Sequence, residues 1–263
     1  MVREFSETGY WALILGGSSG LGLASAKKLA AHGMNICIVH RNSRIEMEEI
    51  SIGFEEIKVF GVELATFNMD VTSSDKRAGM LQELSKIFKP HDKIRCLVHS
   101  IAKGSLKPMV ATDEVMLGND DFQITMQHMA FSLYDWTAAI YQSGLFASDA
   151  RVISFTSEGS KKAIKHYAAV SAAKAALEAI SRSISIEFAP YGIRANCIQA
   201  GITETRSLRM IPGSADLIQH SLNRNPFNRL TQPQDVANVV YLLCKDEASW
   251  INGRIIPVDG GES

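Results

Sequence analysis

The sequence lacks a strong excess of either charge, because 27 Lys and Arg balance 28 Asp and Glu and leave a formal net charge of -1. Nucleic-acid-binding domains carry a basic face and a pI above about 9, so this balance gives no support to a nucleic-acid binder or a polybasic membrane-binding surface. No uninterrupted apolar run approaches the roughly 18 residues that span a bilayer. Residues 1–8 mix both charges and do not resemble a secretory signal. These absences predict a soluble cytoplasmic protein.

Cysteine is also scarce. The sequence has four such residues, Cys37, Cys96, Cys197 and Cys244. No two of them have Cys-x-x-Cys spacing, which excludes a zinc ribbon and a thioredoxin-like redox pair. Each lies in an apolar stretch, and free cysteine is among the most buried residue types, so we expect all four in the core. His99 and His166 have no Cys, Asp or Glu at metal-ligand spacing, so we expect no metal site.

What the sequence does have is an alternation of short apolar runs and longer amphipathic ones. Several short runs are apolar throughout, which is typical of strands covered on both faces of a parallel sheet. Strand followed by helix, repeated about six times, predicts an α/β fold with a doubly wound parallel sheet of about seven strands and helices on both faces. No linker divides the chain, so we expect a single domain over 1–263. The expected strands are 11–15, 35–40, 63–69, 94–99, 151–156, 193–199 and 255–258, and the expected helices are 21–32, 44–56, 73–88, 120–141, 168–188 and 233–243.

Two connections, 100–119 and 201–231, are longer than the rest. Long loops inside a compact domain are usually functional, often as lids. In doubly wound sheets, ligands bind where the carboxyl ends of the strands meet such loops. We therefore expect the functional site between these two connections.

A glycine-rich turn follows the first expected strand and precedes the first helix, with the sequence Gly-Gly-Ser-Ser-Gly-Leu-Gly over 16–22. Glycines let the backbone turn tightly and approach a pyrophosphate, whose charge then lies at a helix N-terminus. The strand before and the helix after the turn favour nucleotide binding over a simple tight turn. The expected cofactor-binding residues here are Gly16, Ser18, Ser19, Gly20, Leu21 and Gly22.

The spacing Gly16-x-x-x-Gly20-x-Gly22 resembles that of the short-chain dehydrogenase/reductase family. Three later segments resemble the same family in order: 68–71 (Asn-Met-Asp-Val), 190–196 and 258–261. The resemblance therefore covers nearly the whole chain. It implies a nicotinamide cofactor, adenine contacts from Asp70 and Val71, and a homo-oligomer, by analogy a homotetramer in which helices 120–141 and 168–188 pack together.

The end of the second strand bears on the choice of cofactor. An acidic residue there would bind a ribose 2′-hydroxyl and repel a 2′-phosphate, but no acidic residue follows His40 until Glu46. Arg41 or Arg44 is able to clamp a phosphate through its planar guanidinium. The alternative is a solvated pair of arginines that opens a helix. We expect NADPH, with NADH as the second possibility and Arg41 as the contact.

The expected catalytic helix carries Tyr167 and Lys174, seven residues apart. Seven helical steps are about 700°, so the two side chains share a face at roughly 10 Å along the axis. Most short-chain dehydrogenases have Tyr four residues before Lys, where this chain has Val170. Tyr-x6-Lys instead resembles the divergent enoyl-acyl-carrier-protein reductase branch.

Segments 98–102 (Val-His-Ser-Ile-Ala) and 200–205 (Ala-Gly-Ile-Thr-Glu-Thr) also resemble that branch. By this resemblance Thr205 would hold the pyrophosphate and Thr203 would line the nicotinamide. The implied cofactor-binding residues of these segments and the helix are Ser100, Ile101, Ala102, Lys174, Gly201, Thr203 and Thr205.

The resemblance also implies the catalytic roles. Lys174 would hydrogen-bond the nicotinamide ribose, and Tyr167 would donate a hydrogen bond to the thioester carbonyl of a trans-2-enoyl substrate. Stabilising an oxyanion in this way contributes roughly 3 kcal/mol. Ser157 stands where the enoyl reductases commonly have a second Tyr, and also where the ketone reductases carry their catalytic Ser. We expect Tyr167, Lys174 and Ser157 as catalytic residues; the alternative is that Tyr167 is a structural aromatic at the helix start.

We therefore expect NAD(P)H-dependent reduction of an enoyl thioester, carried on acyl carrier protein, in fatty acid biosynthesis, with 207–227 as an apolar lid or a subunit contact. One rival is a 3-oxoacyl thioester or other ketone reductase that uses Ser157 with Tyr167. The helix Asn of that pattern corresponds to Gln127, which disfavours it. The other rival is a catalytically silent dinucleotide-binding regulator.

Overall fold

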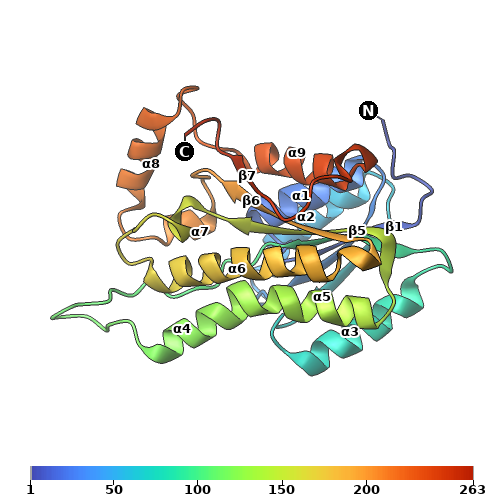
Figure 1. Ribbon diagram of the computed structural model, residues 1–263, viewed down its shortest axis with the longest axis horizontal. Helices are drawn as coiled ribbons and strands as arrows, with labels where there is room; N and C mark the ends of the chain where they lie inside the picture. The colour runs from blue at the N-terminus through green and yellow to red at the C-terminus, as the bar shows by residue number, and fades with distance from the viewer. Residues whose placement is uncertain (1, 263) are drawn as a thin grey trace.

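The computed structural model describes residues 2–262, and its centre is a parallel β-sheet (Figure 1). Within those residues seven strands pair in the order β3-β2-β1-β4-β5-β6-β7. The order reverses between β1 and β4, which are neighbours, so the predicted doubly wound parallel sheet is confirmed. The strands are β1 Tyr10–Leu15, β2 Asn35–His40, β3 Leu64–Asn68, β4 Lys93–His99, β5 Phe146–Thr156, β6 Ile193–Ala200 and β7 Ile255–Val258.

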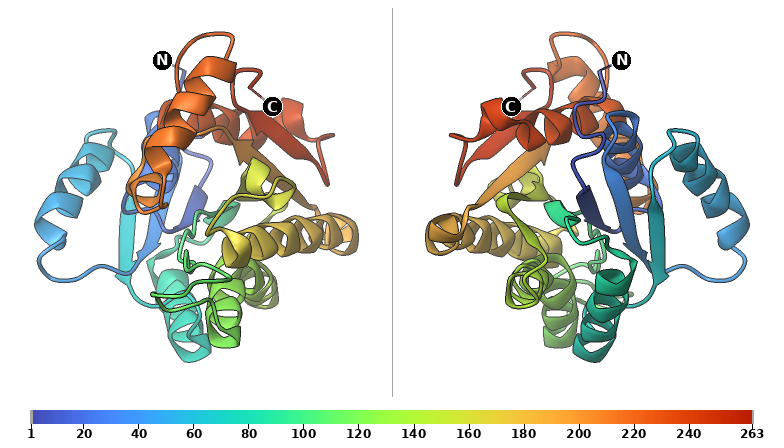
Figure 2. Two further views of the ribbon diagram at one scale, coloured as in Figure 1. Left: turned by 90° about the vertical axis from the view of Figure 1, so that its left-hand side faces the viewer. Right: turned by 90° about the vertical axis from the view of Figure 1, so that its right-hand side faces the viewer.

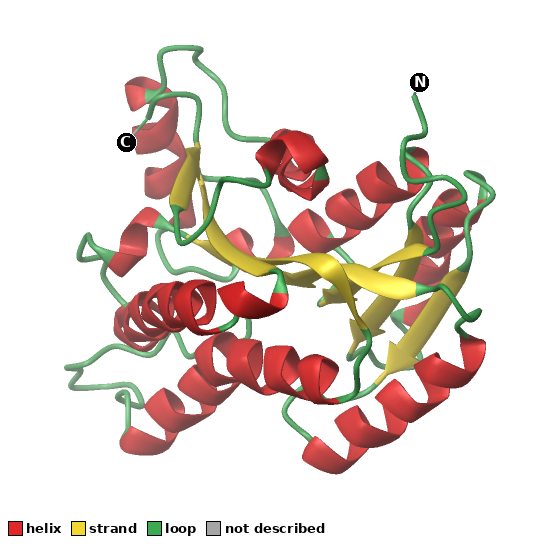
Figure 3. Cartoon of the chain, turned by 45° about the vertical axis from the view of Figure 1, so that its right-hand side comes forward, coloured by secondary structure: helices red, strands yellow, loops and turns green. Residues whose placement is uncertain are grey.

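Helices cover both faces of the sheet (Figures 1 and 3). On one face lie α1 (Gly20–Ala31), α2 (Met47–Lys58) and α9 (Pro233–Cys244), and on the other lie α3 (Ser74–Ile87), α5 (Ser132–Gln142) and α6 (Ala168–Glu187). Side chains alternate along a strand, so β1 sends Trp11 and Leu13 into one apolar core and Ala12 and Ile14 into the other. The four cysteines are free and buried.

The expected helix 120–141 is interrupted. It consists of α4 (Asn119–Met126), a π-helical turn (Gln127–Phe131) and α5. Such turns add one residue to the helical repeat and are frequent at functional sites. The Gln127 amide donates to Asp135 (3.4 Å), whereas Met129 is the residue of this turn that lines the main cavity. The Gln127 side chain is thus engaged with α5, and Gln127 is not among the residues that line the main cavity.

The second long connection is also more regular than expected, because it contains α7 (Arg206–Arg209) and α8 (Ser214–Arg224). Segment 100–118 has no helix or strand. It projects from the same side of the molecule as α8, at the left of Figure 1 and toward the viewer in the left panel of Figure 2. Short 3₁₀ turns occur at Glu158–Ser160, Ala189–Tyr191 and Asp246–Ala248. Over residues 2–262, no helix combines the length and apolarity needed to cross a bilayer.

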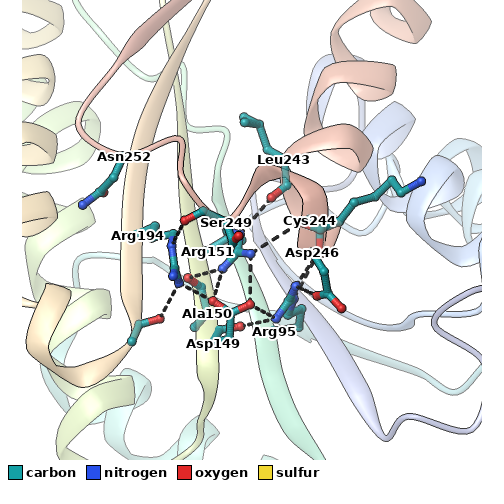
Figure 4. Close-up of polar contacts among 12 residues, drawn as sticks. Arg95, Asp149, Ala150, Arg151, Arg194, Leu243, Cys244, Asp246, Ser249 and Asn252 are labelled. Atoms are coloured by element: carbon teal, nitrogen blue, oxygen red, sulfur yellow. Dashed lines mark hydrogen bonds and ion pairs between the residues drawn. The ribbon is translucent and has the colours of Figure 1, made fainter.

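Two buried arginines at the amino ends of the central strands bind the C-terminus of α9 (Figure 4). The last carbonyls of a helix have no partner within it. Arg95 from β4 donates to the Cys244 carbonyl at 2.9 Å, and Arg151 from β5 donates to the Leu243 carbonyl at 2.9 Å. Both side chains are 1% exposed. The arginines thus satisfy the helix end and join α9 to the sheet.

One carboxylate, that of Asp149, contacts both of these arginines and a third, Arg194. Asp149 accepts from Arg95 at 2.6 Å and from Arg151 at 2.6 Å, and it also pairs with Arg194 from β6. Asp246 provides a second partner for Arg95 at 2.7 Å, but its side chain is 91% exposed. We call Asp149 and its three arginines the arginine cluster. It lies at the opposite end of the strands from the cavity described next.

Candidate active site

A cavity of about 570 Å³ opens at the carboxyl ends of the strands. Its walls come from the glycine-rich turn, the segments after β4, β5 and β6, the start of α6, and α7 and α8. The predicted residues that line it are Gly16, Ser19, Gly20, Leu21, Ser100, Ile101, Ala102, Ser157, Tyr167, Lys174, Gly201, Thr203 and Thr205. Five predicted cofactor contacts lie outside this lining: Ser18, Gly22, Arg41, Asp70 and Val71.

The glycine-rich turn is packed too tightly for other residues at two positions. Gly16 has φ 81°, and a Cβ there would lie 2.2 Å from the Ser100 carbonyl oxygen. A Cβ on Gly22 would lie 2.3 Å from the Gly16 carbonyl oxygen. Gly22 therefore supports the turn from behind instead of lining the cavity. Gly20 has φ 54° and only Thr205 nearby, at 3.6 Å from the ideal Cβ position, so its surface is open toward the cavity.

This turn fits the phosphates of a dinucleotide. Ser19 precedes the first residue of α1 and has extended backbone, so the free N–H groups of the first helical turn point toward the cavity. Helix N-termini of this kind bind anions through those N–H groups and the helix dipole. Gly20 leaves the approach free of a side chain, and Thr205 faces it from the start of α7.

Arg41 and Asp70 form an ion pair across the ends of β2 and β3. The Thr72 hydroxyl also donates to Asp70 (2.7 Å), and His128 Nε2 lies 3.6 Å from it. Burial opposes ionisation of Asp70, but the bonds from Thr72 and the charges of His128 and Arg41 hold its pKa at about 2. Val71 is buried, and its carbonyl accepts from Trp136 Nε1 at 2.9 Å.

Arg41 keeps a 62% exposed side chain, so its guanidinium is accessible to a ligand at the end of β2. Arg44 is also exposed. Glu46 next to it pairs with Arg206 of α7 at 2.7 Å. The Glu46 carboxylate is therefore engaged with α7. The Arg41 guanidinium contacts Asp70 and is otherwise accessible at the end of β2.

Tyr167 and Ser157 meet in the cavity. Tyr167 immediately precedes α6, and its ring packs on Gly159, where a Cβ would lie 2.7 Å from Cε1. Burial raises the pKa of Tyr167, and the nearby Ser157 hydroxyl acts in the opposite direction. That hydroxyl is itself buried and makes no hydrogen bond of ordinary geometry with the residues from 2 to 262. The two oxygens thus face the same space.

Lys174 lies deeper on the same helix face. Its ammonium donates to the Phe155 carbonyl at 2.6 Å, and desolvation lowers its pKa to about 8. Val170, one turn earlier, is buried and packs with Met129 and Ala173. The position four residues before Lys174 thus carries a hydrocarbon side chain, and the phenol of the site comes from Tyr167.

Several lining residues were not expected from the sequence. Met129 arrives through the π-helical turn, and Gly104 lies so close that a Cβ would be 2.6 Å from Val170 Cγ2. Glu262 is buried at the wall, where Ser221 of α8 donates to its carboxylate at 2.8 Å. Arg224 of α8 also donates to the Glu262 carbonyl at 2.6 Å. No local sequence signal marks these residues, because each depends on a contact distant in the chain.

The expected lid 207–227 contributes part of the wall. Its lining residues are Ser207, Leu208, Met210, Ile211 and Leu217. Pro212 instead lines a second, shallower pocket with the projecting segment after β4, and Met210 borders both. Four of these lid residues are apolar, namely Leu208, Met210, Ile211 and Leu217, so this part of the cavity wall suits an apolar substrate group.

The doubly wound sheet and this cavity define an oxidoreductase with a dinucleotide cofactor. The chain belongs to the short-chain dehydrogenase/reductase family, since the family model described as "Enoyl-(Acyl carrier protein) reductase" matches residues 16–263. Members of this family use a nicotinamide cofactor, and the glycine-rich turn, the α1 N-terminus and Lys174 suit one.

Relatives of different activities resemble the chain over almost its whole length. A "Probable 2,4-dienoyl-CoA reductase" of Bacillus subtilis is 30% identical and covers 95% of each chain. A tropinone reductase homologue of Arabidopsis thaliana is 26% identical over 98% of this chain and 94% of its own. The family is thus clear, while the relatives' names divide between double-bond and ketone reduction.

Solved structures agree with this assignment. The enoyl-[acyl-carrier-protein] reductase (NADH) of Aquifex aeolicus has a TM-score of 0.80 and 25% identity, with 97% of this chain and 96% of that chain covered. The enoyl-(acyl-carrier-protein) reductase of Anaplasma phagocytophilum, in complex with NAD, has a TM-score of 0.81 and 20% identity over 100% and 94% of the two chains. At 20% identity, the similarity to the Anaplasma phagocytophilum structure shows the fold alone.

Proposed function

We propose that the protein reduces the trans-2 double bond of an enoyl thioester, carried on acyl carrier protein, as a step of fatty acid biosynthesis. The observation that carries the proposal is the position of the phenol. Tyr167 supplies it from seven residues before Lys174, while the position four residues before Lys174 is the hydrocarbon Val170. The family match and the apolar side chains of 207–217 in the cavity support the same substrate class.

The residues of the cavity suit this chemistry. When bound, a nicotinamide cofactor would supply the hydride for the β-carbon of the enoyl group, and the enolate so formed would gain one proton at the α-carbon. Tyr167 keeps its proton at neutral pH because burial raises its pKa, and it donates a hydrogen bond to the thioester oxygen as negative charge develops there. Lys174 would hold the cofactor ribose and add a positive charge beside the reacting atoms. The apolar lid residues exclude water from the reaction.

A second candidate is reduction of a 3-oxoacyl thioester or another ketone, and one observation favours it. The Ser157 hydroxyl is buried beside Tyr167, makes no hydrogen bond of ordinary geometry in the described chain from 2 to 262, and acts to lower the pKa of Tyr167. A carbonyl oxygen placed between Ser157 and Tyr167 would accept from both hydroxyls. The two candidates therefore differ in how much they need Ser157.

Substitution of the two hydroxyls separates the candidates. For an enoyl reductase, Tyr167→Phe is expected to lower kcat on a crotonyl thioester by about 10²–10³-fold, the loss typical of one oxyanion donor. Ser157→Ala is then expected to lower kcat less than about tenfold. Equal and large losses in both variants, on an acetoacetyl thioester, would support the ketone reductase instead.

For the cofactor we propose NADPH over NADH, with Arg41 as the group that binds the 2′-phosphate. The support is its exposed guanidinium at the end of β2 and the engagement of Glu46 with Arg206. Replacing Arg41 by Gln is expected to weaken NADPH binding by about tenfold or more, since hydrogen bonds to charged groups contribute roughly 1.5–3 kcal/mol, and to leave NADH binding nearly unchanged. Fluorescence titration with both cofactors measures this, and equal effects would refute the assignment.

We further propose a homotetramer that packs α4, α5 and α6 of neighbouring subunits together. Exposed apolar side chains on those helices and on the π-helical turn between α4 and α5 support it, namely Ile124, Phe131, Tyr134 and Ile186. Light scattering after size-exclusion chromatography is expected to give the mass of four chains. A monomeric mass at micromolar concentration would contradict it.

A further inference from the structure

A buried carboxylate lies behind Lys174 and has no role in the chemistry proposed above. Glu178 is four residues beyond Lys174 on α6, and both belong to the buried face of that helix. Residues four apart are neighbours on a helix, with Cβ atoms about 5–6 Å from each other. Glu178 is 5% exposed, so water contributes little to solvating its charge.

Consecutive residues of β5 hold the two side chains. The Lys174 ammonium donates to the Phe155 carbonyl at 2.6 Å. The Thr156 hydroxyl donates to Glu178 Oε1, also at 2.6 Å. The carboxylate is therefore fixed relative to Lys174 by the helix on one side and by the strand on the other. Burying a carboxylate is unfavourable unless hydrogen bonds or an opposite charge compensate it, and here Thr156 and Lys174 supply one each.

The other ionisable groups around Lys174 carry no negative charge near neutral pH. His99 from β4 is kept neutral because burial and the charge of Lys174 lower its pKa to about 3. Burial raises the pKa of the Cys197 thiol on β6, and burial raises that of Tyr167 on the turn before α6. Of the groups that act on Lys174, Glu178 is thus the carboxylate.

Two more carboxylates line the cavity from the segment after β7, Asp259 and Glu262. Glu262 is engaged by Ser221 of α8, and the groups that act on the Lys174 pKa are Cys197 and Glu178. Burial lowers that pKa to about 8, while Cys197 and Glu178 act against the decrease. Of these two groups Glu178 is the carboxylate, whereas burial disfavours the thiolate form of Cys197 and raises its pKa.

We propose that Glu178 is a positioning residue for this site: its carboxylate, fixed by Thr156, keeps the buried ammonium of Lys174 charged and directed at the Phe155 carbonyl. The inference rests on the proposed role of Lys174 in holding the cofactor ribose. It predicts that the charge of Glu178, and not its size, sets the upper pH limit of cofactor binding.

Glu178→Gln tests the charge, because the Gln side-chain oxygen still accepts from Thr156. The direct readout is the Lys174 titration in the cofactor-free protein, followed by NMR of ¹³C-ε-labelled lysine and assigned by the resonance missing in Lys174→Arg. A nearby opposite charge shifts a pKa by about 1–3 units, and Glu178 is one of the groups that raise the Lys174 pKa. The midpoint is therefore expected to fall from about 8 by roughly one unit. Glu187→Gln, on the exposed face of α6, is the matched control and is expected to leave the midpoint unchanged.

The same variants are then tested for cofactor binding. In Glu178→Gln the dissociation constant for NADPH is expected to begin rising with pH about one unit lower than in the wild type. The decrease of kcat/KM at alkaline pH is expected to shift to lower pH by the same amount. Glu178→Asp retains the charge and is expected to restore most of the midpoint. If Glu178→Gln does not fold, Thr156→Val releases the carboxylate and is expected to lower the midpoint in the same direction, by less.

A Lys174 midpoint that stays within 0.2 unit of the wild type in the folded variant would overturn the proposal. Because the NMR titration needs no substrate, its result is independent of the enoyl assignment. A shifted midpoint with no turnover of any enoyl thioester would refute the proposed function and retain the role of Glu178. Normal turnover of an enoyl thioester with an unshifted Lys174 midpoint would support the proposed function and refute the role of Glu178.

Discussion

Replacing Asp149 by Asn is expected to destabilise the protein strongly without affecting the active site. The change removes the charge that the arginine cluster shares, while Arg95 and Arg151 stay 1% exposed. Removing one partner of a buried ion pair typically costs roughly 3–5 kcal/mol because the remaining charge is uncompensated. Two features place the expected loss at the lower end: the Asp149 side chain is 32% exposed, and the carbonyls at the end of α9 still accept from both arginines.

The expected loss is therefore about 3 kcal/mol, which corresponds to a decrease in Tm of about 6 °C for a chain of this size. Thermal unfolding followed by circular dichroism measures it, with urea unfolding as a second probe. The control is Asp246→Asn, which removes a 91% exposed partner of the same Arg95 and is expected to change Tm far less. The kcat is expected to be unchanged, since the arginine cluster lies at the opposite end of the strands from the cavity.

The dependence of stability on pH at acidic pH gives an independent test of the role of Asp149. Burial opposes ionisation of Asp149, but the hydrogen bonds and charges of Arg151 and Arg95 lower its pKa from 3.8 to about 2. The pKa in the folded protein is below that of the unfolded chain, so this stabilisation is complete above pH 3.8 and is lost as the pH falls toward 2. The variant is expected to lack this part of the acid dependence. Equal Tm values for the two substitutions, or an unchanged acid limb, would refute the reasoning.

Three further predictions concern the site and the core. Gly22→Ala is expected to abolish cofactor binding measured by fluorescence, because its Cβ would lie 2.3 Å from the Gly16 carbonyl oxygen; binding at wild-type affinity would show that the turn tolerates the methyl group. Ser221→Ala removes the hydrogen bond to the buried Glu262 carboxylate. It is expected to raise the KM for the substrate severalfold with little change in the affinity for NADPH. Equal weakening of substrate and NADPH binding would contradict a role confined to the lid. The four cysteines are buried and are expected to react with a thiol reagent such as DTNB only on unfolding, so rapid labelling of the native protein would contradict this packing.

The fold could be predicted because its strands are short continuous apolar runs between helices, a pattern that parallel sheets require. The limits of elements were less predictable. β5 begins at Phe146, five residues before the expected strand. Its early residues include the exposed Ser148 and Asp149 of the arginine cluster, which interrupt the apolar run that marks the strand. α2 begins at Met47, since Ser43 and Glu46 hydrogen-bond each other ahead of it.

The site was predictable where it depends on local sequence and not where it depends on distant contacts. The turn over 16–22 and the Tyr167–Lys174 spacing are local patterns, and the cavity brings both together. The π-helical turn that brings Met129 to the wall could not be predicted from local sequence. The apolar residues of 120–141 fit a continuous α-helix as well as a helix with one inserted residue. Glu262 reaches the wall through a bond to Ser221, 41 residues earlier, which a sequence pattern does not reveal. α8 was missed because it packs on the open side of the cavity and not on the sheet.

The central claim is that this site reduces a carbon–carbon double bond, and product analysis tests it most directly. Purified protein with NADPH is incubated in parallel with a crotonyl thioester and an acetoacetyl thioester, and the products are identified by mass spectrometry. The account predicts butyryl thioester from the first substrate, with gain of one hydride and one proton, and negligible 3-hydroxybutyryl thioester from the second. Formation of 3-hydroxybutyryl thioester with intact crotonyl substrate would contradict it and would transfer the chemistry to a ketone held by Ser157 and Tyr167.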